Sequence, residues 1–144
     1  MNETSKSQMP AEDFLRGLLA ALAVENHKLL PASQPQIHRA FYRVVKELKK
    51  PETKSVLDVD LLDVDYDPLY GQSRWFDRAI ARAQRNLIVS FPNPTYNNVF
   101  IRYEPDEGDR ILDALGPRST FKRLADLFFN ELTDTSTQQS TAPS

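Results

Sequence analysis

The stretch SRWFDRAIARAQRNLIVSFPNPTYNNVFIRY, residues 73–103, decides the fold of this 144-residue chain. Residues 73–86 form a predicted helix, because apolar and basic side chains recur on opposite sides at about 100° per residue. The apolar set is Phe76, Ile80, Ala83 and Leu87, and the basic set is Arg74, Arg78, Arg82 and Arg85. Two β-rich runs follow at 87–91 and 98–103, and the prolines and asparagines between them predict a hairpin loop.

The flanking segments predict four further helices and one strand. Gly17, inside the first of these helices, would permit a close contact with another helix. Residues 55–68 alternate between apolar and acidic side chains as a strand does, and the alternation changes phase at Leu61–Leu62, which predicts a bulge or two short strands. The predicted helices are residues 10–25, 35–50, 104–116 and 119–132.

Composition bounds the classes of protein to which the chain can belong. Lys and Arg total 18 against 20 Asp and Glu, so the net charge of −2 argues against a polycation that coats nucleic acid without selectivity. The absence of cysteine excludes a disulfide scaffold, thiolate metal ligands and a cysteine nucleophile. We expect one domain over residues 10–132, with the polar ends 1–9 and 133–144 as disordered tails.

Nothing in the sequence predicts catalysis. His27 and His38 have no acid or hydroxyl at a motif spacing, and four glycines are too few for a phosphate-binding loop. We therefore expect no enzymatic activity, no catalytic residue, no cofactor and no metal. No apolar run approaches the ~20 residues of a membrane span. The first residues lack the basic segment followed by an apolar segment that is typical of a signal peptide. The expected location is cytoplasmic, without membrane contact.

The element order resembles that of a winged-helix domain over residues 11–115. The runs RAQRNLIVSF (82–91) and NVFIRYEPDEGDRIL (98–112) carry the resemblance. It implies an α+β fold in which helices surround a small antiparallel sheet with a hairpin wing. It also implies that the helix before the hairpin lies in the DNA major groove. The two central helices stand about twenty residues apart, whereas a helix-turn-helix joins them by a turn of about 3–4 residues. Either residues 68–71 contain a very short helix or the winged fold is a modified one.

The run LLDVDYDPLYGQSRWFDRAIARAQRNLI, residues 61–88, is also similar to the centre of Panacea-type domains, found in antitoxins and phage-associated proteins. In those domains an aromatic-rich strand is followed by a Tyr-Gly turn and then by the helix before the wing. Tyr66, Tyr70 and Gly71 fit this description. Such proteins act mainly by binding another protein. Small winged-helix subunits of bacterial defence systems are similar to this chain too. This resemblance implies a protein-interaction module, an antitoxin or an adaptor subunit.

The arginines of residues 73–86 are the main candidates for function. DNA affinity depends on the neutralisation of phosphates, and arginine is the commonest reader of guanine edges. On this hypothesis Arg78 and Arg82 reach bases or phosphates, and the others hold phosphates. The predicted nucleic-acid-binding residues are Arg74, Arg78, Arg82, Arg85, Tyr96, Asn97 and Arg102. The alternatives are a face for an acidic protein partner, a plain solvated face, and arginines already paired with the aspartates of residues 55–68.

Two other charged sets are weaker candidates. A second basic face is predicted on the helix over 35–50, formed by Arg39, Arg43, Lys46 and Lys50. The aspartate series consists of Asp58, Asp60, Asp63, Asp65 and Asp67. Such carboxylates could hold Mg²⁺ for a nuclease, but their spacing misses that of an EF-hand loop. The preferred interpretations are an edge strand protected by charge and an intrachain partner for arginines.

The terminal helix over 119–132 has an apolar side that is wide for a surface helix. It could pack on the first helix or pair with its copy in a homodimer. The predicted dimer interface consists of Phe121, Leu124, Phe128 and Phe129. The leading hypothesis from sequence is therefore a homodimeric regulator that binds double-stranded DNA. The alternative is a module that binds an acidic protein partner.

Overall fold

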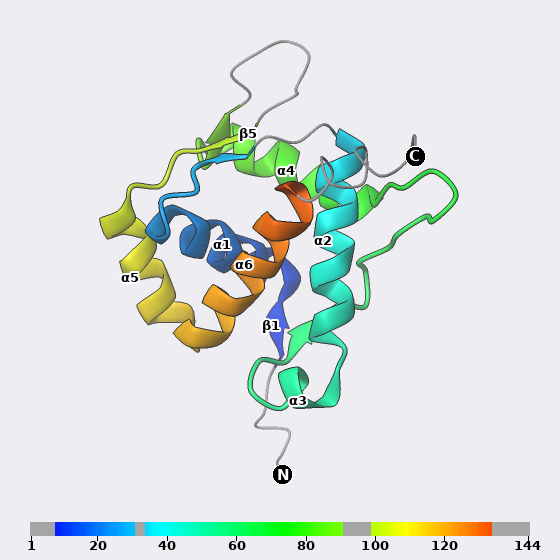
Figure 1. Cartoon of the computed structure of the whole chain (residues 1–144), viewed down its shortest axis with the longest axis horizontal. Coiled ribbons are helices and arrows are strands. Elements are labelled where there is room, and N and C mark those ends of the chain that lie inside the picture. Colours follow the sequence, from blue (N-terminus) through cyan, green and yellow to red (C-terminus); the bar gives the residue numbers. More distant parts are fainter. Residues whose placement is uncertain (1–7, 31–33, 91–98, 134–144) are drawn as a thin grey trace, which may run out of the picture.

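A computed structural model describes residues 8–30, 34–90 and 99–133 of the chain (Figure 1). The fold is α+β, as the sequence predicts, with helices surrounding a small antiparallel sheet. In chain order the strands are β1 (Met9–Pro10), β2 (Leu29–Leu30), β3 (Val59–Asp60), β4 (Val89–Ser90) and β5 (Val99–Ile101). The helices are α1 (Ala11–Val24), α2 (Gln34–Leu48), α3 (Pro51–Lys54), α4 (Arg74–Arg85), α5 (Pro105–Leu115) and α6 (Arg118–Thr133).

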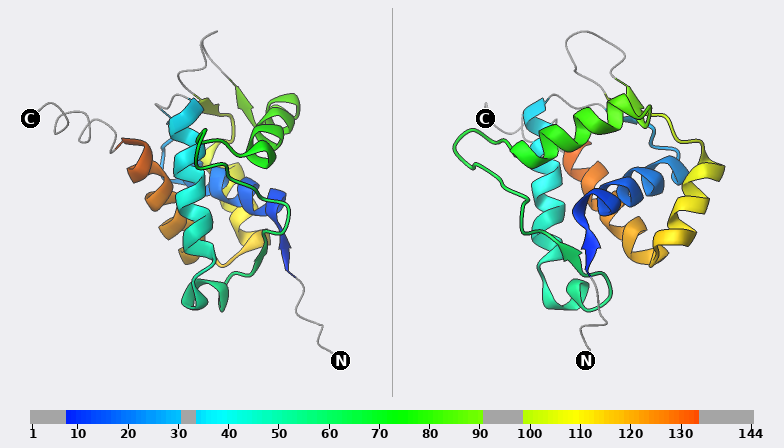
Figure 2. Two further views of the ribbon diagram at one scale, coloured as in Figure 1. Left: turned by 90° about the vertical axis from the view of Figure 1, so that its right-hand side faces the viewer. Right: turned by 180° about the vertical axis from the view of Figure 1, so that it is seen from behind.

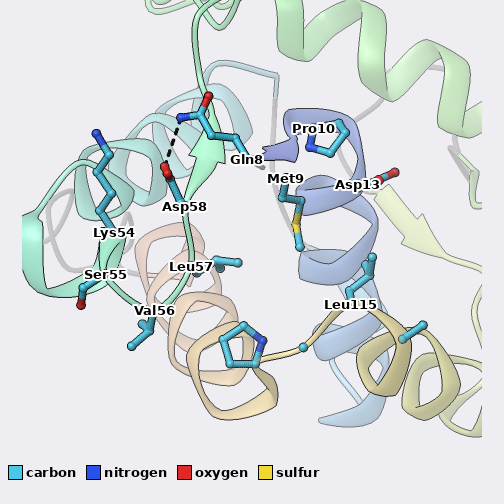
Figure 3. A pocket seen from close by; sticks show the side chains of 13 residues that line it. Gln8, Met9, Pro10, Asp13, Lys54, Ser55, Val56, Leu57, Asp58 and Leu115 are labelled. Carbon is cyan, nitrogen blue, oxygen red and sulfur yellow. Dashed lines mark hydrogen bonds between the residues drawn. The ribbon is translucent and has the colours of Figure 1, made fainter. Parts of the chain in front are cut away.

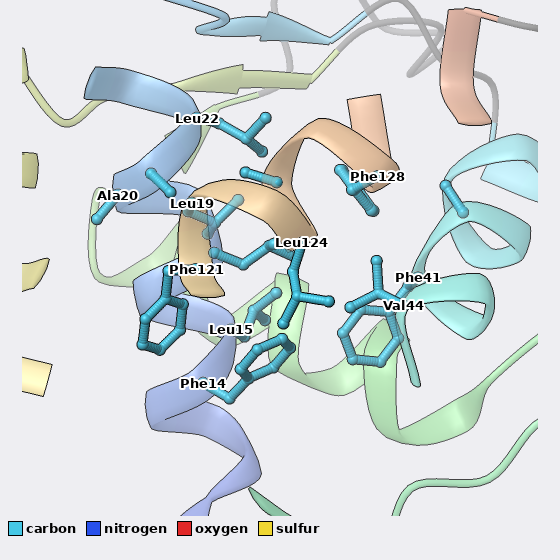
Figure 4. Close-up of a cluster of buried hydrophobic side chains, with 14 of the residues drawn as sticks. Phe14, Leu15, Leu19, Ala20, Leu22, Phe41, Val44, Phe121, Leu124 and Phe128 are labelled. Carbon is cyan, nitrogen blue, oxygen red and sulfur yellow. The ribbon is translucent and has the colours of Figure 1, made fainter. Parts of the chain in front are cut away.

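Helix α1 forms the centre of the core, because apolar residues occupy almost its whole circumference. It packs against α5 and α6, and α6 packs in turn against α2 (Figures 1 and 4). Gly17 allows the close approach that the sequence predicts, since a Cβ there would lie 2.6 Å from Cζ of Phe121 on α6. The Phe121 ring stacks on Phe14 at a centroid distance of 5.6 Å, which fixes its position.

The predicted dimer interface is wrong for three of its four residues. Phe121, Leu124 and Phe128 are fully buried within the chain, where they face α1 and α2 (Figure 4). The wide apolar side of α6 is explained by two helical neighbours rather than by a second copy. Phe129 is half-buried, and its ring stacks on His27 at 4.0 Å between centroids.

The three-stranded antiparallel sheet has the order β2-β5-β4. Val89 of β4 pairs with Ile101 of β5, which confirms the predicted strands on either side of the hairpin loop. Leu30 of β2 pairs with Val99, so β2 joins the other edge of β5. The sequence analysis missed β2, because two residues between breaks carry no periodic signal. The order α1, β2, α2, α4, β4, β5 is compatible with a winged-helix-like fold.

The aspartate-rich segment 55–68 is not the strand that its alternation predicts. Within it only Val59–Asp60 is a strand, which pairs in parallel with Met9–Pro10. The remainder consists of turns and irregular backbone, where aspartate side chains bind nearby backbone N–H groups. Asp60 Oδ1 accepts from the N–H of Leu62 at 3.1 Å, and Asp67 Oδ1 accepts from the N–H of Leu69 at 2.9 Å. No short helix forms at 68–71; Asp67 and Gln72 instead form an isolated antiparallel bridge.

Candidate nucleic-acid interface

Helix α4 begins in a network of hydrogen bonds that fixes its direction. The hydroxyl of Ser73, the N-cap residue, accepts from the N–H of Phe76 at 3.0 Å. Asp65 accepts from the N–H groups of Arg74 and Trp75, at 3.1 and 2.9 Å, and from the hydroxyl of Ser73 at 3.3 Å. A carboxylate at this end of a helix satisfies free donors and is favoured by the helix dipole. Asp65 is therefore a capping residue for α4.

His38 of α2 completes this network from the core. Its Nδ1 accepts from the N–H of Ser73 at 2.9 Å, and its ring contacts Phe76 edge-on. The side chain is buried, which lowers the pKa of His38, while the carboxylates of Asp77 and Asp65 raise it in part. The ring is thus held neutral, with the acceptor nitrogen facing α4.

Aromatic packing against α2 determines which side of α4 faces outward. Phe76 stacks on Phe41 of α2 at 4.5 Å between centroids, and Trp75 stacks on the same ring at 5.7 Å. Seen from behind, α4 crosses α2 (Figure 2). The buried side of α4 consists of Trp75, Phe76, Ala79, Ile80 and Ala83. Trp75 is therefore part of the core.

The opposite side of α4 carries three exposed arginines, Arg74, Arg78 and Arg85. Their guanidinium groups form no ion pair or hydrogen bond with residues 8–30, 34–90 or 99–133. At about 100° per residue, the three side chains fall within about 40° of arc and point away from the buried side. We call these three side chains the outward face of α4. They are three positive charges available to an external ligand.

Arg82 does not belong to this outward face. Its Nε and one terminal nitrogen donate to the two carboxylate oxygens of Glu12 on α1, at 2.8 and 3.0 Å. Hydrogen bonding to Glu12 raises the pKa of the Arg82 guanidinium. The expectation that Arg82 reaches bases or phosphates is therefore corrected, since its charge is neutralised by the first turn of α1.

Of the hairpin residues predicted to contact DNA, the structure places one. Arg102 directly follows β5 and is exposed, and its backbone N–H donates to the carbonyl of Ile88 at 2.7 Å. Because Ile88 lies three residues after α4, this bond holds Arg102 close to the helix end that carries Arg85. Tyr96 and Asn97 lie outside the described residues.

The aspartate series does not neutralise the arginines of α4 in the part of the chain that the structure describes. Asp60, Asp65 and Asp67 accept backbone N–H groups, and Asp58 accepts from the side-chain amide of Gln8 at 3.2 Å. The expectation that these aspartates pair with the arginines is therefore wrong for the described residues. The same residues contain no group of three His, Cys, Asp or Glu side chains placed to hold a metal ion.

All four residues of the second basic face are exposed: Arg39, Arg43 and Lys46 on α2, and Lys50 just after it. Lys50 differs in being paired, because its ammonium lies 3.1 Å from Oε1 of Glu47. Hydrogen bonds from Arg123 and Lys50 lower the pKa of Glu47. Beside this face, Tyr42 stacks flat on Tyr66 at 4.0 Å, which attaches the segment before α4 to α2.

A hollow of about 440 Å³ lies beside the β1–β3 pair, away from α4 (Figure 3). Met9, Leu57 and Leu115 supply part of its apolar wall. Its two carboxylates already have partners, since Asp58 binds Gln8 and Asp13 lies 3.3 Å from Arg16. We assign no role to this hollow. Among the helices described, none is long and apolar enough to cross a membrane.

Comparison with protein-family models, curated proteins and solved structures found no match to the chain. The sequence analysis missed Glu12, Asp65 and His38 as determinants of the site. A Ser at position 73 with an acid nearby could have indicated the cap of α4. No local signal indicates the bond between Arg82 and Glu12, which stand 70 positions apart.

Proposed function

We propose that this protein binds double-stranded DNA through the outward face of α4 and acts as a DNA-binding regulator. The observation that carries the proposal is the set of three exposed arginines that have no partner within the described part of the chain. Surface patches of a single charge sign are best avoided unless they attract an oppositely charged ligand. Here Asp65 and Asp67 accept backbone N–H groups, and the exposed Asp77 of α4 lies 3.9 Å from the ring of His38. Among the described residues, none of these carboxylates pairs with Arg74, Arg78 or Arg85, which keep their charge for a ligand.

The shape of the site supports a duplex as the ligand. A major groove about 12 Å wide admits one α-helix. The buried side of α4 rests on α2, which leaves the arginine side to enter the groove. In this arrangement Arg78, near the middle of the helix, contacts bases or phosphates. Arg74 and Arg85 near the helix ends, with Arg102 after β5, contact phosphates.

The test is a fluorescence-anisotropy titration of the protein with random-sequence duplex DNA at several salt concentrations. Each neutralised phosphate contributes a slope of about −0.9 to the plot of log affinity against log salt. Four arginine contacts therefore predict a slope of about −3.6. Arg78→Ala should reduce the magnitude of the slope by about 0.9.

Arg110→Ala is the matched control, because Arg110 is an exposed arginine on α5, outside the proposed site. It removes the same charge and should leave the slope of the wild type. Binding that does not weaken with salt, or equal slopes for the two variants, would contradict the proposal.

A further inference from the structure

The loop between β3 and α4 exposes three large apolar side chains. Leu62 is 88% exposed, Leu69 80% and Tyr70 72%. The loop projects from the body of the molecule at the start of α4 (Figures 1 and 2). Leu69 and Tyr70 are adjacent, and neighbouring exposed apolar groups mark interaction surfaces more often than they serve folding. We call residues 60–72 the acidic loop.

The acidic loop is held in one conformation by its own hydrogen bonds. At its tip, the N–H of Asp67 donates to the carbonyl of Gln72 at 2.7 Å, and the N–H of Gly71 donates to the carbonyl of Asp67 at 2.7 Å. Gly71 has φ of +65°, which a glycine adopts without strain. The stacking of Tyr66 on Tyr42 fixes the base of the tip. Leu69 and Tyr70 are therefore presented in a preorganised turn, which lowers the entropic cost of binding.

Charge determines which kind of ligand this surface fits. The acidic loop contains four aspartates and no lysine or arginine. Such a surface repels DNA phosphates, and it repels the same loop of a second copy. A complementary partner combines an apolar pocket for Leu69 and Tyr70 with lysine or arginine at its border. Tyr is among the residues that most often dominate binding energy at such centres.

We propose that the acidic loop is a docking site for a second protein that presents an apolar pocket bordered by basic side chains. This site is separate from the outward face of α4 and does not depend on DNA binding. The loop joins directly to the N-terminus of α4 through Asp65 and Ser73. A partner on Leu69 and Tyr70 would therefore stand next to the DNA-binding helix.

The test uses a phage-displayed library of random peptides, selected on the full-length protein. We expect enrichment of peptides that combine aromatic or aliphatic residues with Lys or Arg. Titration of a labelled selected peptide should show a loss of about tenfold or more for Tyr70→Ser and for Leu69→Ser. Both side chains are exposed, so neither change disturbs the core. Leu29→Ser, which removes an exposed leucine from β2, should bind as the wild type does.

Three results would overturn the proposal. The selection could yield no peptide that binds in solution. The selected peptides could bind Tyr70→Ser and Leu69→Ser as tightly as the wild type. Sedimentation velocity could show that the purified protein self-associates and that Tyr70→Ser abolishes this, which would assign the loop to a second copy. The DNA titration of the same loop variants should match the wild type, so the two proposals succeed or fail independently.

Discussion

The backbone N–H of Ser73, at the start of α4, donates to Nδ1 of His38 on α2 at 2.9 Å. This bond makes the placement of α4 depend on the protonation state of a buried imidazole. A protonated ring carries hydrogen on both nitrogens and can no longer accept from Ser73. The position of α4 and the stability of the fold are thus linked to pH through one residue.

The first prediction concerns this pH dependence. Burial lowers the pKa of His38 from the ordinary value of 6.5, against the opposing effect of Asp77 and Asp65. The unfolded chain therefore takes up a proton at a higher pH than the folded one. It follows that the free energy of unfolding decreases as the pH falls from about 6.5 toward the folded-state pKa. The contribution of the neutral His38 is complete above about pH 6.5.

Urea unfolding between about pH 8 and about pH 5 measures this effect. His38→Asn is the informative variant, because its amide oxygen can accept from Ser73 without titrating. Its stability should depend less on pH than that of the wild type over this window. Parallel curves for the two proteins would show that His38 is not the linked group.

The second prediction concerns the cap of α4. Burial raises the pKa of Asp65, but hydrogen bonds from Trp75, Arg74 and Ser73 outweigh it, so the pKa lies below its ordinary value. Asp65→Ala should lower the free energy of unfolding by about 1–2 kcal/mol, because it leaves the first N–H groups of α4 without an acceptor. Asp63→Ala removes an exposed aspartate of the same loop and should change stability by less than about 0.5 kcal/mol. Urea unfolding at neutral pH compares the two, and equal losses would contradict the cap.

The third prediction concerns Gly17. Alanine is favoured over glycine inside a helix by about 1 kcal/mol. Gly17→Ala should nevertheless destabilise the protein by up to about 2 kcal/mol, because overpacking against the buried Phe121 ring costs about 1–3 kcal/mol. Thermal unfolding measures the cost of Gly17→Ala in two backgrounds. The cost should be smaller when Gly17→Ala is added to Phe121→Leu than when it is added to the wild type. A more stable Gly17→Ala protein would mean that the Phe121 ring moves aside.

The parts of the fold that the sequence predicted correctly are those with a strong local period. Helix α4 and its hairpin strands follow from the spacing of Phe76, Ile80 and the arginines, and Gly17 marks a real helix contact. The prediction of a strand over residues 55–68 was wrong, because aspartates that cap turns can alternate with apolar residues as the residues of a strand do.

Tertiary contacts account for the other errors. The apolar residues of α6 look alike whether they face a second copy or the same chain, so periodicity could not distinguish a dimer interface from the core. Whether each arginine of α4 is free depends on partners far along the chain. Only the folded structure brings Glu12 to Arg82 and leaves Arg78 without such a partner among the residues described.

The last prediction uses the Glu12–Arg82 pair to test the DNA-binding hypothesis by a gain of function. Glu12→Gln removes the charge that neutralises Arg82 but keeps a side chain of the same size. Both side chains are partly exposed, so stability should change by only about 0.5 kcal/mol. The freed Arg82 lies on the same helix as Arg78, so the salt dependence of DNA binding should steepen by up to about 0.9 in log–log slope.

Glu25→Gln is the matched control. Glu25 directly follows α1 and lies 3.4 Å from Lys122 of α6, so this variant gains the same net charge at the opposite end of α1 from Glu12. If DNA meets α4, Glu12→Gln binds more tightly and with a steeper slope, while Glu25→Gln keeps the slope of the wild type. Equal effects of the two variants would show that net charge alone governs binding and that α4 has no special role, because only one of them changes the partner of an α4 arginine.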